Sequence, residues 1–313
     1  MGNRPTGNLT SGQHLYWLGQ KLSPDRPLYN MAMLFELGSG LDIACLQRTF
    51  QDLVNANDAL RTVFTESDGA PVSRVLPEFP YELQVVNLED TASRDAWADK
   101  RSREMLNLEE RSFDSVLLRL PDGRLTWYIC LHHLCVDVLS MANLFRQFSA
   151  RYQQRIGDPS PEDHTAPQFR DYARFEQDVR HDEASSKARE YWESLSDDFA
   201  PLSFYGRQCQ RPDTASKRVM LELGAKRQKA LERMMRNPDL PALNDNVNRL
   251  NLIATALLAF LYRVCESDRL AVGLPVHNRR SSAFSDTVGL FVEIFPLLCE
   301  ISGEESFKAV SYT

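Results

Sequence analysis

The stretch from Ser115 to Ile156 constrains the fold more than any other part of the chain. Two β-rich runs, 115–120 and 125–133, flank the dipeptide Asp122-Gly123, which is a strong signal for a tight hairpin turn. The residues from Val138 to Ile156 then place apolar side chains at the spacing of an amphipathic helix. A hairpin that leads directly into such a helix predicts a fold in which strands and helices are mixed.

The same mixture of patterns continues along the rest of the 313 residues. We therefore predict an α/β fold of the mixed, α+β kind. Expected helices cover residues 11–22, 42–55, 95–106, 168–195, 226–236 and 250–266. Expected strands cover residues 30–37, 62–65, 72–76, 82–86, 218–223, 270–276 and 291–301.

A change of pattern between Asp197 and Ser216 marks the expected boundary between two lobes. Pro201, Gly206 and Pro212 interrupt both the helical and the strand periodicity in this interval. The predicted division is a first lobe over residues 1–200 and a second lobe over residues 201–313.

Charge and hydropathy limit the partners of the chain. A net charge of −7, with acids interleaved in every basic stretch, argues against nucleic-acid binding. No run reaches the roughly 18 apolar residues of a membrane span, and the best candidate, Leu252 to Val264, predicts a buried helix. Residues 1–10 lack the apolar core of a signal peptide. The six cysteines form no Cys-x-x-Cys pair, so we expect reduced thiols and a cytoplasmic protein.

Two adjacent histidines, His132 and His133, end the second β-rich run. Neighbouring side chains of a strand point to opposite faces, so the two imidazoles cannot have the same role. Parity places His133 with Ile129 and Leu131. An imidazole that ends a strand and faces a cleft is suited to act as a general base near neutral pH. Asp137 is close enough in sequence to shape the loop or to pair with a distant cation.

Two other interpretations of this segment stay open on the residues alone. Buried histidines are often satisfied core residues without a chemical role, and a His-x-x-x-Asp spacing also occurs by chance. Zinc is a further option because His132, His133 and Cys135 lie together. A zinc site needs three or four ligands at suitable spacings, and no partner cluster occurs elsewhere in the sequence, so we predict no metal.

Five segments occur in an order typical of one family. Residues 132–137 read His-His-Leu-Cys-Val-Asp, residues 10–17 read Thr-Ser-Gly-Gln-His-Leu-Tyr-Trp, and residues 57–64 read Asn-Asp-Ala-Leu-Arg-Thr-Val-Phe. Residues 169–173 read Phe-Arg-Asp-Tyr-Ala, and residues 288–292 read Val-Gly-Leu-Phe-Val. Together they resemble the motifs of nonribosomal peptide synthetase condensation domains, within the chloramphenicol-acetyltransferase-like superfamily. The resemblance runs from near residue 9 to the end of the chain.

The resemblance implies two acetyltransferase-like lobes arranged in a V, with the second lobe expected to be incomplete. It implies an acyltransferase that forms an amide bond between a carrier-bound acyl or peptidyl thioester and a carrier-bound amine. Donor and acceptor carrier proteins (thiolation domains) and neighbouring synthetase domains would be its partners. The substrates would arrive on 4'-phosphopantetheine, and the chain itself would bind no cofactor.

The resemblance also implies roles for single residues. The second histidine of the motif, here His133, would take a proton from the acceptor amine or position that amine, with His132 beside it. Asp137 would be chiefly structural and would pair with an arginine, for which Arg279 in the segment Pro-Val-His-Asn-Arg is the expected partner. A lysine would be a poor substitute where a bidentate fork holds a carboxylate.

The residues around the start of the following helix are expected to line the tunnel or to hold the oxyanion. These are Leu134, Val138 and Ser140. The family has glycine where this chain has Val138. Valine is β-branched and stiff, so we expect it to narrow the tunnel or to shift an oxyanion donor.

Other functions within and beyond this family remain open. A related acyltransferase would use a free thioester donor or a hydroxyl acceptor with the same base. An epimerising variant retains both histidines, whereas a heterocyclising variant replaces them and is not expected. A non-catalytic condensation-like module would only dock carrier proteins, and Val138 and the early end of the chain favour it. Intact His133 and Asp137 oppose it.

Overall fold

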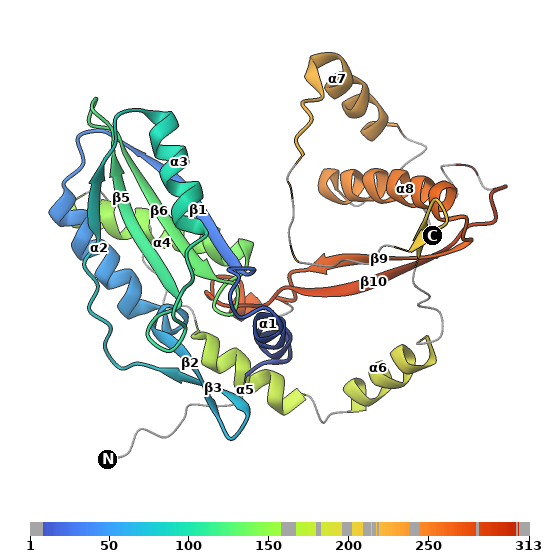
Figure 1. The fold of residues 1–313 in the computed structure, drawn as a ribbon, viewed down its shortest axis with the longest axis horizontal. Coiled ribbons are helices and arrows are strands. Elements are labelled where there is room, and N and C mark those ends of the chain that lie inside the picture. Colours follow the sequence, from blue (N-terminus) through green and yellow to red (C-terminus); the bar gives the residue numbers. More distant parts are fainter. Residues whose placement is uncertain are drawn as a thin grey trace. The chain divides into compact units, whose positions relative to one another are not determined.

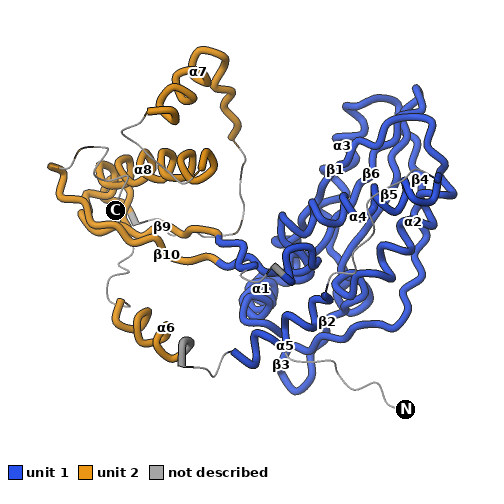
Figure 2. Tube along the Cα trace, turned by 180° about the vertical axis from the view of Figure 1, so that it is seen from behind, with its two compact units in different colours: residues 1–185, 276–293 blue, residues 186–275, 294–313 orange. Residues whose placement is uncertain are grey.

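The computed structural model describes residues 9–157, 167–179, 183–195, 202–208, 214, 217, 219–237, 244–279, 282–304 and 306. The chain divides into two compact units (Figure 2): unit 1 contains residues 1–185 and 276–293, and unit 2 contains residues 186–275 and 294–313. This differs from the division at residue 200 expected from the sequence. The segment 276–293 returns to unit 1 because buried polar contacts, described below, hold it there.

Unit 1 is built around a mixed four-stranded sheet in the order β1-β6-β5-β4 (Figure 1). The central strand β6 is antiparallel to both of its neighbours, and β4 is parallel to β5. All of β6 is buried, as expected for a strand with helices on both faces. The strands are β1 (Asn30–Gly38), β4 (Gln84–Asn87), β5 (Phe113–Arg119) and β6 (Leu125–His132).

The side chains of β6 alternate between two clusters of apolar residues. Trp127, Ile129 and Leu131 belong to the main core with α2 (Ile43–Ala56) and α4 (Val138–Arg155). Tyr128 and Cys130 belong to a smaller cluster with α3 (Thr91–Ser102), which covers the other face of the sheet (Figure 1). The alternation predicted for the strand before the histidines is therefore present.

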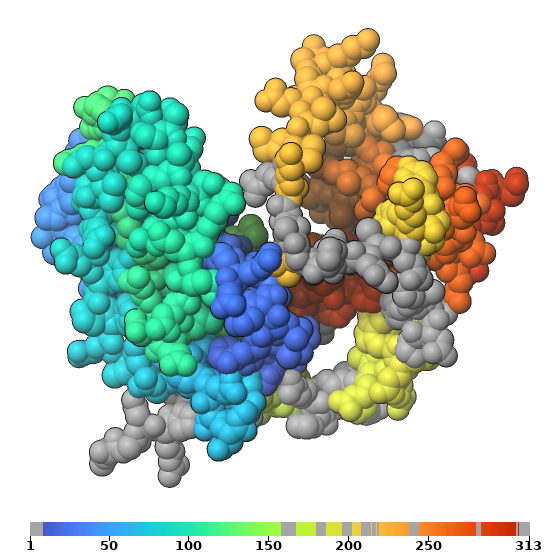
Figure 3. Space-filling model, viewed as in Figure 1, coloured from blue at the N-terminus to red at the C-terminus, as the bar shows by residue number. Residues whose placement is uncertain are grey.

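The remaining elements of unit 1 surround this sheet. Helix α1 (Ser11–Leu22) begins at a capping box, in which the Thr10 hydroxyl accepts from Gln13 N and the Gln13 side chain accepts from Thr10 N. Such a box satisfies two backbone donors that a helix start leaves open. Helix α1 and the β2–β3 hairpin lie on the face of unit 1 seen in Figure 3. The other elements are η1 (Asp58–Arg61), β2 (Thr62–Ser67), β3 (Ala70–Val75), α5 (Phe169–Val179) and η3 (Ser282–Phe284).

Unit 2 has its own small core between a helix and a two-stranded sheet of β9 and β10. Leu258, Leu261 and Val264 of α8 pack there with Leu270 and Cys299. Its elements are β7 (Ser203–Phe204), β8 (Arg207–Gln208), α7 (Gly224–Met235), α8 (Asp245–Cys265), β9 (Arg269–Val276) and β10 (Glu293–Glu300), with most of α6 (Glu183–Ser194).

Helix α8 is long and apolar enough, by length and composition alone, to cross a membrane. A single helix of this kind is weak support for a span, because core helices pass the same test. The face of α8 that includes Leu252, Leu258 and Leu261 is buried. Ile253, Leu257 and Phe260 on the same helix are exposed among the described residues.

Several expected elements differ from the structure in their bounds or in kind, and α8 begins at Asp245 instead of residue 250. The helix expected over residues 168–195 is two helices, α5 and α6, and residues 180–182 between them lie outside the described residues. Helix α3 begins at Thr91 instead of residue 95 because Asp90 caps it. The prediction of a strand over residues 218–223 was wrong. Residues 219–223 have no strand structure, and Val219 is 85% exposed and pairs with no strand among the described residues.

Candidate functional site

The two histidines lie where β6 gives way to α4. His132 is the last residue of β6 and pairs with Asn30 of β1. His133 follows the strand, and its backbone N–H donates to Tyr29 O over 2.8 Å. A turn closed by Cys135 N donating to His132 O then leads into α4. Backbone hydrogen bonds on both sides therefore fix the place of the two imidazoles.

His133 is partly buried beside Tyr16 of α1. The two rings stack with centroids 4.5 Å apart and an angle of 23° between their planes. Burial lowers the pKa of His133 below its ordinary value of 6.5, while Asp137 and the backbone groups of His133 and Val136 act in the opposite direction. Nδ1 is buried and makes no regular hydrogen bond within the described part of the chain. His133 is thus mainly neutral at pH 7 and can accept a proton.

His132 occupies a different environment, although it is the neighbouring residue. Its Nδ1 accepts from Leu134 N over 3.2 Å, so the ring proton is on Nε2, which lies 3.3 Å from Gln20 Oε1. The side chain is 3% exposed. Burial, followed by the charge of His133, lowers the pKa of His132 to about 4. Both ring nitrogens of His132 are therefore engaged in contacts that hold the turn.

A cavity of about 200 Å³ in unit 1 borders His132. Its apolar wall includes Trp17 and Phe64. The polar groups of Gln20 and His132 that face it are satisfied by protein atoms. Gln20 Nε2 donates to the carbonyls of Ser23 and Arg26, and Gln20 Oε1 contacts His132. Because Gln20 and His132 are engaged in this way, these two side chains do not indicate a ligand for the cavity.

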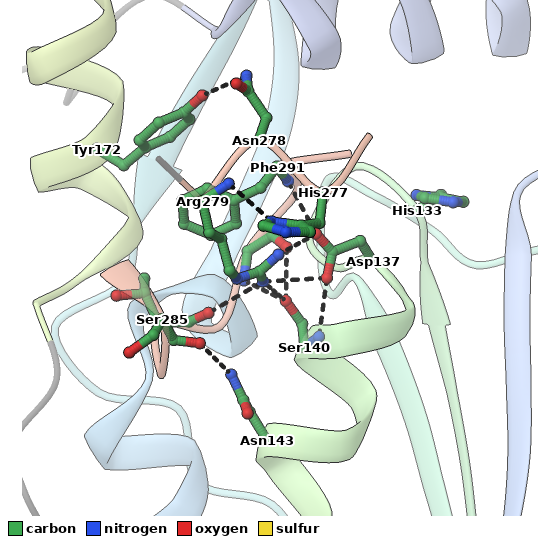
Figure 4. A network of polar contacts seen from close by, with 12 residues as sticks. His133, Asp137, Ser140, Asn143, Tyr172, His277, Asn278, Arg279, Ser285 and Phe291 are labelled. Atoms are coloured by element: carbon green, nitrogen blue, oxygen red, sulfur yellow. Dashed lines mark hydrogen bonds and ion pairs between the residues drawn. The ribbon is translucent and has the colours of Figure 1, made fainter. Parts of the chain in front are cut away.

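Asp137 and Arg279 form a buried, bidentate ion pair (Figure 4). Arg279 donates from its two terminal nitrogens to the two carboxylate oxygens of Asp137, over 2.7 and 3.1 Å. Their side chains are 4% and 2% exposed. The same carboxylate caps α4 by accepting from Ser140 N and accepts from Phe291 N. The structure thus brings together the two residues paired in the sequence analysis.

Arg279 is held by more than its carboxylate partner. Its guanidinium carbon lies 4.1 Å from the centroid of the Phe291 ring, a cation–π contact. One terminal nitrogen also donates to Thr287 O over 3.3 Å, and Arg279 N donates to His277 Nδ1. These contacts lie within residues 277–291, whereas the bonds of Arg279 and of Phe291 N to Asp137 tie this segment to α4 of unit 1.

Ser140 joins α4 to the late motif of the sequence. Its hydroxyl donates to Gly289 O over 2.7 Å and accepts from Gly289 N and from Arg279. Leu134 N is used by His132, and Leu134 O accepts from Gln13 Nε2 over 2.8 Å. Leu134 and Ser140 were expected to line the tunnel or to hold the oxyanion, and here the backbone of Leu134 and the hydroxyl of Ser140 make hydrogen bonds within the protein.

Val138 is the first residue of α4, and its side chain is 61% exposed. It is not among the described residues with positive φ. The position therefore has helical backbone that valine adopts without strain. Figure 4 shows His133 on the other side of Asp137 from the Arg279 network.

Several contacts around the site involve residues whose roles were not predicted from the sequence. Asp58 is buried and accepts from the backbone N–H groups of Phe169 and Arg170 at the start of α5. Gln168 accepts from Asp58 N and donates to Ala56 O. Two of the recognised motifs therefore bind each other. The joint occurrence of these two motifs in the sequence could have indicated the contact. The residues of the motifs alone do not show which atoms meet.

Comparisons with known proteins agree with this architecture. A model of the family described as "Condensation domain" matches residues 4–312. The isonitrile lipopeptide synthase of Mycobacterium tuberculosis is 26% identical over 317 residues, which cover 96% of this chain and 12% of that protein. The dimodular nonribosomal peptide synthase of Bacillus subtilis (strain 168) is 24% identical, with 96% of this chain and 13% of that protein covered. The chain spans a small part of these relatives.

Solved structures show the same fold. The first condensation domain of the calcium-dependent antibiotic synthetase is similar with a TM-score of 0.82 at 24% identity, covering 98% of this chain and 72% of that one. The starter condensation domain of rhizomide synthetase has a TM-score of 0.79 at 19% identity, covering 97% and 68%. This likeness confirms the mixed α/β fold predicted from the sequence.

Proposed function

Since the chain belongs to the condensation domain family of nonribosomal peptide synthetases, we propose that it joins a carrier-bound acyl or peptidyl thioester to a carrier-bound amine. The observation that carries this proposal is the state of His133. Its backbone is fixed between β6 and α4, its imidazole stacks on Tyr16, and the imidazole is mainly neutral at pH 7, since burial lowers its pKa. A neutral imidazole in a fixed position is what a general base requires.

The proposed reaction is an aminolysis. The amine nitrogen attacks the thioester carbonyl carbon, the new C–N bond forms, and the C–S bond breaks to release the thiol of the donor carrier. His133 accepts the proton that the amine loses and returns it to the departing sulfur, so that no proton is gained or lost overall. Holding two tethered substrates face to face supplies much of the remaining acceleration.

Asp137 and Arg279 have a supporting role in this proposal. Asp137 caps α4, and the ion pair ties the start of that helix to residues 279–291. The turn that carries His133 ends at Asp137, so the pair limits the movement of the base. Positioning of this kind affects turnover, because small displacements of a catalytic group have large costs in rate.

We propose different roles for the three residues around the start of α4 that were expected to line the tunnel or to hold the oxyanion. Leu134 N and the Ser140 hydroxyl are engaged within the protein, so neither is proposed as an oxyanion donor. We propose that Val138 borders the substrate path, because its side chain is exposed directly after Asp137. Its substitution for the glycine of the family pattern would then affect which donors fit.

Product analysis with two acceptors tests the function. The chain is mixed with a donor carrier loaded with an acyl thioester and with an acceptor carrier that presents either an amine or a hydroxyl, and the acceptor is followed by intact mass. We expect acylation of the amine carrier. Acylation of the hydroxyl carrier alone would support a related acyltransferase. Binding of both carriers without any product would contradict the proposal and favour a docking module.

A further inference from the structure

We propose that Tyr16 is a positioning residue for His133, an inference that rests on the proposed function of that histidine. Tyr16 belongs to α1, far from the histidine motif in sequence. Its ring covers one face of the His133 imidazole, with centroids 4.5 Å apart and planes inclined by 23°. The stack limits rotation of the imidazole about its own side-chain bonds.

The ring of Tyr16 contributes more to this contact than its hydroxyl. The Tyr16 oxygen lies 3.5 Å from His133 Nε2, which is at the long limit for a hydrogen bond. His133 Nδ1 makes no regular hydrogen bond with the described residues. Because the polar contacts of the ring nitrogens are weak, packing contributes to the orientation of the ring, and Tyr16 is the aromatic side chain stacked on it.

Tyr16 is itself fixed by Tyr29. The edge of one ring meets the face of the other, with centroids 5.0 Å apart and an angle of 75°. Tyr29 also holds His133 directly, because Tyr29 O accepts from His133 N over 2.8 Å. Gly19 makes room for this arrangement, since a Cβ at that position would lie 2.0 Å from the Tyr29 hydroxyl. One residue therefore orients both members of the stack.

Helix α1 is attached to the histidine turn at two further points. Gln13 Nε2 donates to Leu134 O over 2.8 Å, and Gln20 Oε1 lies 3.3 Å from His132 Nε2. Tyr16 lies between these two residues in α1. The helix and the turn are thus fastened on both sides of the stack, which gives Tyr16 a defined place over the imidazole.

The stack also keeps water from His133. Burial is the main cause of its lowered pKa, while Asp137 and the backbone of Val136 act against it. The neighbouring His132 is neutral at pH 7, because its own pKa is about 4. Removing the Tyr16 ring admits water to one face of the imidazole and should move the His133 pKa upward, toward its ordinary value.

The experiment combines a histidine titration by NMR with turnover measurements. The protein is labelled at the Cε1 carbons of histidine, and the His133 signal is assigned by its loss in His133→Asn. The variants are Tyr16→Ala, Tyr16→Leu and Tyr16→Phe. Tyr16→Leu keeps apolar volume and so protects the fold if the alanine variant is unstable. Tyr81→Phe is the matched control, because the Tyr81 hydroxyl bonds the backbone N–H and carbonyl of Ser115, away from His133.

We expect Tyr16→Ala to raise the titration midpoint of His133, and we expect both Tyr16→Ala and Tyr16→Leu to lower kcat about tenfold or more, with KM changed less. Tyr16→Phe retains the ring and should keep both quantities within about threefold of wild type. Tyr81→Phe should lower stability without moving the midpoint. An unchanged kcat in Tyr16→Leu, or an unchanged midpoint and kcat in Tyr16→Ala, would overturn the inference. The titration needs no turnover, so it separates this result from a failure of the proposed function, which would show as wild type without product.

Discussion

His132 and His133 are neighbours in sequence, but their imidazole rings differ in burial and in the contacts of their ring nitrogens. His132 has both ring nitrogens engaged and is almost fully buried. His133 stacks on Tyr16 and has no strong hydrogen bond at either ring nitrogen among the described residues. In the proposed function, His132 therefore supports the turn and His133 takes part in proton transfer.

The low pKa of His132 predicts a dependence of stability on pH. Its pKa is about 4 in the folded chain and about 6.5 when unfolded, so the unfolded state binds a proton first as the pH falls. The contribution of His132 to the free energy of unfolding is fully present above pH 6.5 and is lost as the pH falls toward 4. Between pH 7.5 and pH 5 the free energy of unfolding should drop by about 2 kcal/mol.

Urea unfolding of wild type and His132→Asn at the two pH values measures this contribution. Asparagine does not titrate, and its oxygen can accept from Leu134 N as Nδ1 does. The variant should lose about 2 kcal/mol of the pH dependence. His14→Asn, which replaces an exposed histidine, should keep the wild-type dependence. Equal dependence in wild type and His132→Asn would show that His132 is not the group responsible.

The Asp137–Arg279 pair predicts strong coupling between two distant positions. Replacing Asp137 by alanine leaves a buried guanidinium without its carboxylate and removes the cap of α4. We expect a loss of about 3–5 kcal/mol in the free energy of unfolding. Asp137→Ala, Arg279→Ala and the double variant form a cycle that urea unfolding can follow. The double variant should cost clearly less than the sum of the single ones, and additive losses would contradict the coupling.

Some of these contacts between residues could be predicted from the sequence, and others could not. The pairing of Asp137 with Arg279 follows from the family pattern, because both residues stand in recognised segments. The stacking of Tyr16 on His133 does not, since it depends on how α1 docks against the turn. The hydrogen bonds of Leu134 O and of the Ser140 hydroxyl were not predicted either, because they join residues more than a hundred positions apart.

At the scale of elements, α4, α5 and the late motif meet at Gly289. A Cβ on Gly289 would lie 1.9 Å from Cδ2 of Phe169, the first residue of α5. Gly289 N and O both bond to Ser140 of α4. The absence of a side chain therefore permits three segments to approach each other closely.

This close approach predicts that Gly289→Ala destabilises unit 1. The methyl group has to displace a buried aromatic ring, and overpacking of this kind costs about 1–3 kcal/mol or more. Gly12→Ala is the matched control, because its Cβ would meet the nearest atom, in Leu290, at an ordinary 3.7 Å. Thermal unfolding should show a clear loss for Gly289→Ala and a small change for Gly12→Ala. Similar melting temperatures for the two variants would contradict the steric argument.

Most elements of unit 1 were predicted within a few residues, because their apolar periodicity is strong. Helix α2 and strand β6 are examples in which buried residues fall at the expected spacing. The start of α3 was missed because the Asp90 cap and its reciprocal bond with Ser93 outweigh the charged pattern that follows. Residues 219–223 have strand-like composition, but pairing depends on a neighbour that sequence alone does not supply.

For the whole molecule, the fold class could be predicted, whereas the two compact units divide the chain differently from the expected boundary at residue 200. The mixed α/β class follows from local patterns and from the order of motifs. The return of residues 276–293 to unit 1 depends on Arg279 and Gly289 binding α4, about 140 residues earlier in the chain. A boundary chosen from proline and glycine positions does not detect contacts of that range.

The proposal that His133 is the base makes a direct prediction for the molecule as a whole. A donor-loaded and an amine-loaded carrier are mixed with wild type, His133→Ala or His14→Ala, and the initial rate of amide formation is followed by intact mass. We predict a rate about 10²–10⁴-fold lower for His133→Ala, with an unchanged melting temperature, and a wild-type rate for the exposed-histidine control. A His133→Ala rate within tenfold of wild type would contradict the assignment of His133 as the base.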